Sequence, residues 1–71
     1  MNVKELRAEM VLHDDTGETL AKALNISRQT LSRKMNDNGA EFTQSEIGII
    51  KNRYDLSGDR INAIFFAEKV S

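Results

Sequence analysis

The stretch Thr16–Met35 has the sequence TGETLAKALNISRQTLSRKM, and it decides the fold. It divides into two short amphipathic segments joined by a tight turn at Asn25. Asparagine is second only to glycine in tolerating the left-handed backbone conformation that such a turn needs. The second segment starts at a capping serine, Ser27, and spaces Leu31 and Met35 four residues apart, as one buried face of a helix requires. Thr16–Met35 therefore predicts two short helices packed against each other across a turn.

The remaining segments also predict helices. The chain contains no proline, and its apolar residues recur at three- and four-residue spacings, which favours helices over strands. A polar residue that can cap a helix precedes each such segment, and several caps lie between apolar residues at the spacing of a hydrophobic staple. The expected caps are Asn2, Thr16, Ser27, Thr43 and Ser57. We therefore expect an all-α domain over residues 1–71, a compact bundle of about five short helices whose last helix covers about residues 57–68.

Local signals mark individual helix ends. Thr43-Gln44-Ser45-Glu46 has the sequence of a full capping box, in which the first and last side chains bond each other's backbone N–H groups. Asn36-Asp37-Asn38-Gly39 consists of residues that favour turns and positive φ, so it predicts a stop. Gly48 weakens the helix that it occupies by up to about 1 kcal/mol relative to alanine. The residues expected to face the core are Val3, Leu6, Met10, Leu20, Ala21, Leu24, Leu31, Met35, Ile47, Ile50, Tyr54, Ile61, Ile64 and Phe65.

Composition excludes several classes of protein. Seventy-one residues bury only about 60% of their unfolded surface, so the stability of such a domain is modest or shared with a partner. The absence of cysteine excludes a disulfide and a thiolate zinc site. No apolar run approaches the roughly 18 residues of a membrane span, and the N-terminus is too polar for a signal peptide. We expect a soluble cytoplasmic protein that does not interact with membranes.

Charge is distributed unevenly along the chain. The formal net charge is −1, which by itself does not favour a nucleic-acid partner. Residues 27–36, however, contain Arg28, Arg33 and Lys34 and no acid, whereas acids gather on other segments. A neutral chain with one basic helix is compatible with DNA binding.

The two short helices predict a helix-turn-helix at about residues 16–36, a motif whose second helix lies in the DNA major groove. With Leu31 and Met35 inside, the side chains left to contact bases are Arg28, Gln29, Ser32 and Arg33. Arginine can bind guanine through two hydrogen bonds and glutamine can bind adenine in the same way. Arg28 and Arg33 could either read bases or bind phosphates. Gln29 is the most informative of the four, because phosphate attraction does not explain a neutral side chain. The alternative interpretation is an ordinary solvated helix face, and Lys22 faces solvent under either interpretation.

Phosphate contacts are expected around this helix. The free N–H groups at the start of the first helix of the pair, at Thr16 and Gly17, can bind an anion. Ser27 can cap its own helix or contact phosphate. The full set of expected phosphate-contacting residues is Thr16, Gly17, Ser27, Lys34, Asn36, Asn38, Thr43 and Gln44.

The motif resembles the lambda-repressor-like helix-turn-helix domains, in which the second and third of about five helices form the motif. The matching residues are Leu20, Ala21, Leu24, Ile26 and Leu31. The chain departs from that family at Asn25, where glycine is usual, and at Lys34, where the residue is often apolar.

The run LAKALNISRQTLSRKMN, the segment TQSEI and the ending FFAEKV are similar to short Cro-like regulators of bacteriophages, especially those of Gram-positive hosts. This resemblance implies an early repressor in the bacterial cytoplasm that competes with a larger phage repressor at double-stranded operator DNA. It also implies a role in the choice between lytic and lysogenic growth.

One other role remains as an alternative, a protein-interaction module that binds a larger phage repressor as an antirepressor or co-repressor. Enzymatic catalysis is not expected, because so small a bundle rarely has a shaped pocket and no serine has an evident basic partner. His13 beside two acids is more simply solvated than part of a metal site. We expect no catalytic residue, no metal and no cofactor.

The C-terminal segment predicts a further contact. Phe66 and Val70 lie outside the expected core stripe of the last helix, and helix-turn-helix regulators commonly form dimers. We expect these two residues at the interface of a homodimer or with another partner. Local packing of the C-terminal tail is the alternative explanation for Phe66.

Overall fold

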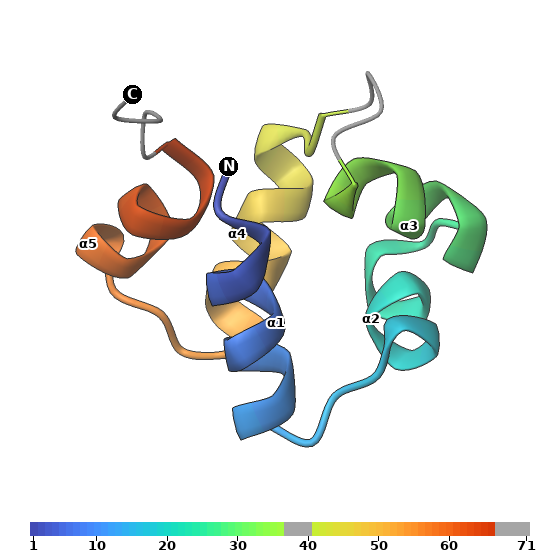
Figure 1. Ribbon diagram of the computed structural model, residues 1–71, viewed down its shortest axis with the longest axis horizontal. Helices are drawn as coiled ribbons and strands as arrows, with labels where there is room; N and C mark the ends of the chain where they lie inside the picture. The colour runs from blue at the N-terminus through green and yellow to red at the C-terminus, as the bar shows by residue number, and fades with distance from the viewer. Residues whose placement is uncertain (37–40, 67–71) are drawn as a thin grey trace.

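The computed structural model describes residues 1–36 and 41–66, and in these ranges it contains helices and no strand (Figure 1). The helices are α1 (Val3–Leu12), α2 (Gly17–Leu24), α3 (Arg28–Met35), α4 (Gln44–Arg53) and α5 (Gly58–Ile61). The last of them continues directly as a π-helical turn, η1 (Asn62–Phe66). The predicted all-α bundle of about five short helices is therefore confirmed. The predicted end of the last helix, at about residue 68, lies outside the described residues.

The five predicted helix caps are all confirmed. Each capping side chain accepts a hydrogen bond from the backbone N–H three residues later, and each capping residue has an extended backbone. The Thr43–Glu46 capping box is also present, with the Thr43 N–H donating to Glu46 Oε1 at 2.7 Å. A second capping box joins Thr16 to Thr19, which the sequence pattern did not indicate because a threonine replaces the usual acid or amide.

Asn25 has the predicted left-handed conformation in the connection between α2 and α3. Its φ and ψ are 57° and 42°. The reversal allows the Ile26 N–H to reach the Ala21 carbonyl at 3.0 Å, so a carbonyl at the end of α2 is satisfied. Ala21 is buried, and its small side chain lets the start of α3 approach α2 closely.

Side chains from all the helices, α1 to α5 and η1, form the core. Leu6, Leu20, Leu31, Ile50 and Ile64 are its largest fully buried side chains. Almost every residue expected to face the core is buried, while Val3, Ile47 and Phe65 are only partly covered and pack against its edge. The backbone N–H of Asn2 donates to the Ile64 carbonyl at 2.6 Å, which fastens the N-terminus to η1.

The helices are arranged so that α3 lies at one side of the molecule. In Figure 1, α1 and α4 overlap at the centre of the view, α2 and α3 lie to the right, and α5 with η1 lies to the left. The far side of α3 therefore has no helix against it in the described part of the chain. None of the helices in residues 1–36 and 41–66 combines the length and apolar character that crossing a bilayer demands.

A buried carboxylate ties the α1–α2 connection to the end of α4. Asp15 exposes only 4% of its side chain and accepts hydrogen bonds from Arg53 Nε and Nη2 at 2.7 and 2.8 Å. The Tyr54 hydroxyl donates to it at 2.5 Å, and Thr19 also donates to it. The Arg53 hydrogen bonds, with those of Thr19 and Tyr54, hold the pKa of Asp15 well below its usual value despite burial. We call these four residues the Asp15 cluster.

Candidate nucleic-acid interface

Four of the predicted DNA-contacting side chains lie on the exposed side of α3. Leu31 and Met35 point into the core, so the other side of this helix faces solvent. The exposed residues there are Arg28, Gln29, Ser32 and Arg33. The helix contains no acidic residue, and its last turn is basic. The structure thus brings the predicted base-contacting residues onto one surface, which we call the α3 outer face.

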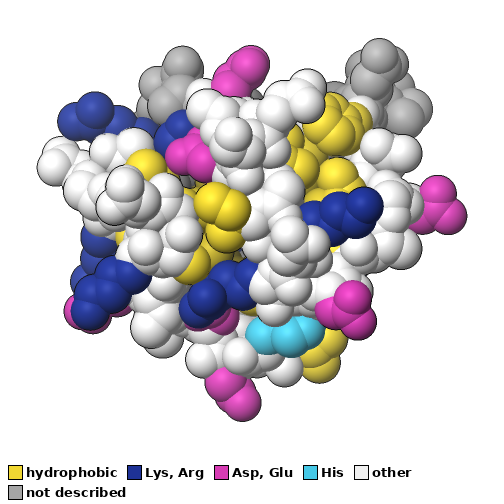
Figure 2. Space-filling model, turned by 180° about the vertical axis from the view of Figure 1, so that it is seen from behind, with side chains coloured by type: hydrophobic (Ala, Val, Ile, Leu, Met, Phe, Trp, Pro, Cys, Tyr) yellow, Lys and Arg dark blue, Asp and Glu magenta, His cyan; other side chains and the backbone are white. Residues whose placement is uncertain are grey.

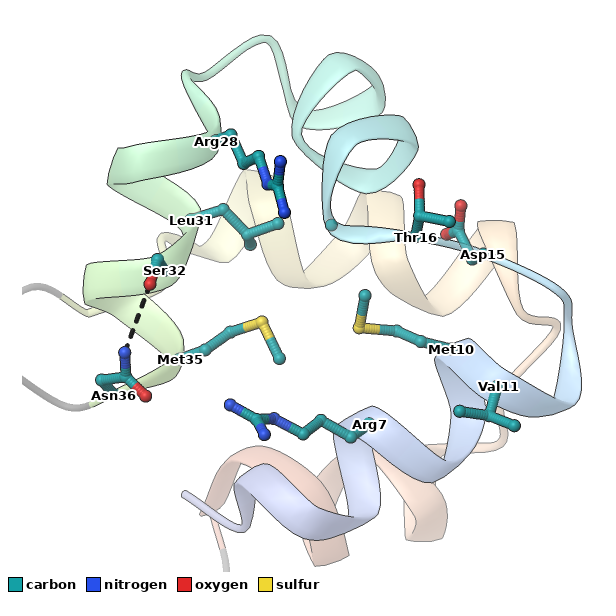
Figure 3. Close-up of a pocket in the computed structure, with 11 residues that line it drawn as sticks. Arg7, Met10, Val11, Asp15, Thr16, Arg28, Leu31, Ser32, Met35 and Asn36 are labelled. Atoms are coloured by element: carbon teal, nitrogen blue, oxygen red, sulfur yellow. Dashed lines mark hydrogen bonds between the residues drawn. The ribbon is translucent and has the colours of Figure 1, made fainter.

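Arg28 extends from α3 toward the beginning of α2 (Figure 3). Its Nε lies 4.0 Å from the position that a Cβ on Gly17 would occupy. The guanidinium therefore lies beside the N-terminus of α2, whose free N–H groups and positive dipole end attract anions. This position suits a phosphate contact by Arg28, which is one of the two roles that the sequence left open for it.

The hydroxyls of Thr16, Ser27 and Thr43, which were expected to contact phosphate, already form helix-capping hydrogen bonds. The Thr16 hydroxyl accepts from the Thr19 N–H at 3.2 Å, and the backbone N–H of Thr16 donates to Thr19 Oγ1 at 2.9 Å. The Ser27 hydroxyl accepts from the Thr30 N–H at 3.0 Å and is also bonded to the Thr30 hydroxyl. Thr43 has both its hydroxyl and its N–H bonded to Glu46. Capping is therefore the role that the structure gives these hydroxyls.

Asn36 and Gln44 remain accessible at the end of α3 and the start of α4. Asn36 Nδ2 donates to Ser32 Oγ at 3.2 Å, which orients both side chains at the edge of the α3 outer face (Figure 3). Gln44 is exposed in the first turn of α4. Asn38, another expected phosphate contact, lies outside the described residues.

Lys34 does not fit the predicted phosphate contact. Its side chain is only 11% exposed, and its ammonium donates to Glu46 Oε1 at 2.9 Å and to the Glu41 carbonyl at 2.8 Å. It also lies 5.7 Å from the centre of the Phe42 ring. The ammonium group of Lys34 therefore forms an ion pair within the protein, and this pair links α3 to α4. The sequence could not show this, because the partner lies twelve residues away on another helix.

Glu46 is suited to hold that charge. Burial raises the pKa of its carboxyl, but the hydrogen bond from the Thr43 N–H and the ammonium of Lys34 outweigh burial and lower the pKa below its usual value. Glu46 is thus charged at neutral pH and acts both as a helix cap and as the partner of Lys34. We call this buried contact the Lys34–Glu46 pair.

Arg7 is a candidate that the sequence interpretation missed. It extends from α1 toward Met35 of α3 and lines the same pocket as Arg28, while Arg33 lies on the α3 outer face (Figure 3). Within residues 1–36 and 41–66, these three arginines have no carboxylate within 4.0 Å, whereas Arg53 and Arg60 are paired. Arg7 is three residues before Met10, so its helix position could have suggested this side, but the approach of α1 to α3 could not be predicted. Figure 2 shows more Lys and Arg at the side of α2 and α3, on the left.

The expected interface residue Phe66 is 58% exposed at the end of η1. Its neighbour Phe65 is partly buried and meets the Phe42 ring edge-on, with the ring centres 5.5 Å apart. Phe66 is therefore available for a contact with another chain. Val70 lies outside the described residues.

His13 has structural contacts. Its Nδ1 lies 2.8 Å from the Glu9 carbonyl oxygen, and its ring stacks on Tyr54 with the centres 4.9 Å apart. In the two described ranges, no three residues with acid, histidine or cysteine side chains are grouped as metal ligands would be. His13 thus helps to cover the Asp15 cluster.

The chain matches no family model, and no curated protein or solved structure is significantly similar to it. Its function is therefore inferred from the chemistry of the α3 outer face.

Proposed function

We propose that the protein is a sequence-specific DNA-binding regulator that places α3 in the major groove, with α2 and α3 acting as a helix-turn-helix. The observation that carries this proposal is the α3 outer face, which is exposed, basic and free of acidic side chains. An α-helix with its side chains is about 10–12 Å across, which fits the roughly 12 Å width of the major groove. The short connection at Asn25 supports the assignment, because it fixes α3 rigidly against α2.

The polar side chains divide between two roles. Gln29 and Arg33 lie one helical turn apart on the exposed side, so both can approach base edges, glutamine at adenine and arginine at guanine. Arg28 lies beside Gly17 at the start of α2, where it and the helix N-terminus can hold one phosphate. Ser32 is short and lets the helix approach closely. In this proposal base contacts specify the sequence and phosphate contacts set the position.

The resemblance to short Cro-like phage regulators extends the proposal to a repressor acting at operator DNA. Such regulators commonly bind two half-sites about 34 Å apart as dimers. Exposure of Phe66 supports a role for that residue in pairing two copies. The surface of one copy supplies a single reading helix, so a symmetric operator would require the pair.

The primary experiment is selection of bound sites from randomised double-stranded DNA, followed by affinity measurements on the selected site at two salt concentrations. We expect one enriched half-site and a steep loss of affinity with salt, because phosphate contacts release counterions. The spacing and symmetry of the enriched half-sites give the number of protomers. If no sequence is enriched and no salt-dependent binding occurs at micromolar protein, the DNA-binding proposal is wrong.

Gln29→Ala tests the base-reading role directly. We expect relaxed preference at one base position, corresponding to about 1–3 kcal/mol of lost discrimination. Lys22→Ala is the matched control, because Lys22 is exposed on α2 away from the α3 outer face and pairs only loosely with Glu18 at 4.0 Å. A uniform loss of affinity at every base with Gln29→Ala would contradict its assignment.

The rival function is a module that binds a larger phage repressor as an antirepressor or co-repressor. Exposed apolar side chains favour this candidate, since Val11 and Leu12 at the end of α1 are 75% and 73% exposed. Absence of a specific DNA complex at micromolar protein, together with co-purification of a repressor chain, would favour it over DNA binding.

A further inference from the structure

A cleft of about 380 Å³ lies between α1, the start of α2 and α3. Its floor consists of Met10, Leu31 and Met35, and the two methionine side chains point toward each other across it (Figure 3). The volume is close to the lower limit of about 300 Å³ for sites that hold whole small molecules, so it can take one or two side chains. We call it the α1–α3 cleft.

The cleft has an apolar and adaptable lining. Val11 forms part of its wall and is 75% exposed, and Leu12 beside it is 73% exposed. Methionine side chains are flexible and polarisable, and they are common at surfaces that accept varied apolar groups. Met10, Leu31 and Met35 are 7%, 1% and 7% exposed, so the unfavourable water contact that an inserted aliphatic or aromatic side chain would remove lies mainly at Val11.

The edges of the cleft are positively charged. Arg7 and Arg28 reach into it from opposite helices, and in the described part of the chain neither has a carboxylate within 4.0 Å (Figure 3). The one acid in the wall, Asp15, is already bonded to Arg53 and Tyr54 and exposes 4% of its side chain, so it does not offset the arginines. The N-terminus of α2 at Gly17 adds partial positive charge on the same side.

We propose that the α1–α3 cleft docks a segment of a partner protein that carries apolar side chains next to carboxylates. The apolar side chains pack against Val11 and over the floor formed by Met10 and Met35, and the carboxylates face Arg7 and Arg28. Charge complementarity selects this occupant, because the cleft joins an apolar floor to two arginines that have no carboxylate within 4.0 Å among residues 1–36 and 41–66. The inference goes beyond DNA binding and does not depend on it. Because Arg28 belongs to both surfaces, a docked segment also covers one edge of the α3 outer face.

The first test uses designed peptides as probes. A fluorescein-labelled twelve-residue peptide with leucines on one helical face and glutamates on the flanks is titrated with the full chain and followed by fluorescence anisotropy. We expect a Kd below about 1 mM. Two control peptides, one with glutamine for glutamate and one with serine for leucine, should bind at least about fivefold more weakly. No saturable binding, or equal binding of all three peptides, would overturn the proposal.

Variants then test whether the peptide binds in the α1–α3 cleft. Arg7→Gln and Arg28→Gln should each weaken peptide binding about two- to fivefold, and Val11→Ser about five- to tenfold. All three residues are exposed, so the variants should fold, which circular dichroism checks. Lys4→Gln and Arg33→Gln are the matched controls, because they remove equal charge from the same two helices outside the cleft. Equal effects of the cleft and control variants would mean attraction to net charge only and would overturn the proposal.

Two further measurements separate other occupants. On DNA, Arg33→Gln should weaken binding while Val11→Ser should not, which is the reverse of their effects on the peptide. If Val11→Ser and Arg7→Gln weaken duplex DNA binding and the peptide does not bind, the cleft belongs to the DNA interface and the proposal fails. If Val11→Ser instead lowers the molar mass in solution without peptide, a second copy of the chain occupies the cleft, and the proposal of a partner protein also fails.

Discussion

Replacing Asp15 by asparagine should destabilise the domain far more than removal of one exposed surface carboxylate would. The Asp15 carboxylate is 4% exposed and accepts two hydrogen bonds from Arg53, one from Tyr54 and one from Thr19. Hydrogen bonds to a charged group contribute roughly 1.5–3 kcal/mol each. Arg53 exposes about a third of its side chain, so it regains water when the carboxylate is lost, and only part of the sum is forfeited. We therefore expect Asp15→Asn to lower the free energy of unfolding by about 2–3 kcal/mol.

The measurement is urea unfolding followed by circular dichroism at pH 7 and at about pH 3. The Arg53 hydrogen bonds lower the pKa of Asp15 in the folded protein, as do Thr19 and Tyr54, so its stabilising effect is complete above the unfolded value of about 3.9. That stability is lost as pH falls toward the lower, folded pKa. The gap between the wild type and Asp15→Asn should therefore shrink by about 1 kcal/mol at pH 3.

Asp14→Asn is the matched control for this experiment. Asp14 is the neighbouring residue, it is exposed, and its φ of 53° is a conformation that asparagine tolerates well. This change should alter the free energy of unfolding by no more than about 0.5 kcal/mol. If the two variants lose equal stability, or if the gap for Asp15→Asn does not depend on pH, the Asp15 cluster does not stabilise the fold in the way argued.

Three further substitutions test other contacts. Lys34→Ala should lower the free energy of unfolding in urea by about 3 kcal/mol, because it leaves Glu46 buried without its partner. Adding Glu46→Gln should restore part of this loss, and an absence of any restoration would contradict the Lys34–Glu46 pair. Gly48→Ala should raise the free energy of unfolding by about 0.5–1 kcal/mol, since a Cβ there meets no atom within 4 Å, and a loss would mean unseen crowding. Phe66→Ala should lower both the molar mass from light scattering and the operator affinity; if neither changes, Phe66 is not an interface residue.

Local signals in the sequence predicted the helix starts well. A capping side chain acts on a backbone N–H three residues away, so its effect is encoded within one turn of the chain. Asn2, Ser27 and Ser57 each cap as expected for this reason. The reversal at Asn25 also follows from one residue, because few side chains tolerate positive φ.

The sequence patterns did not predict the contacts between helices. Lys34 has the same charge and helix position that a phosphate-binding lysine would have, and only the approach of α4 shows that its ammonium is bonded to Glu46. Arg7 was overlooked because the α1–α3 cleft exists only after α1 and α3 are brought together. Asp15, which the sequence shows only as one of two acids beside His13, is the centre of a cluster whose partner Arg53 lies 38 residues later in the sequence. Helical periodicity predicts which face of a helix is buried, but it does not predict which neighbour that face meets.

The Lys34–Glu46 pair constrains how this sequence can diverge. A change at either position alone leaves an uncompensated buried charge, whereas exchange of both residues for uncharged side chains removes it. Because Glu46 also accepts a hydrogen bond from the Thr43 N–H, the uncharged state should keep glutamine at 46. Evolution should therefore move between an ionic pair and an uncharged pair, with single replacements counter-selected. Homologous chains should show covariation of these two positions, even where the segment between them changes in length.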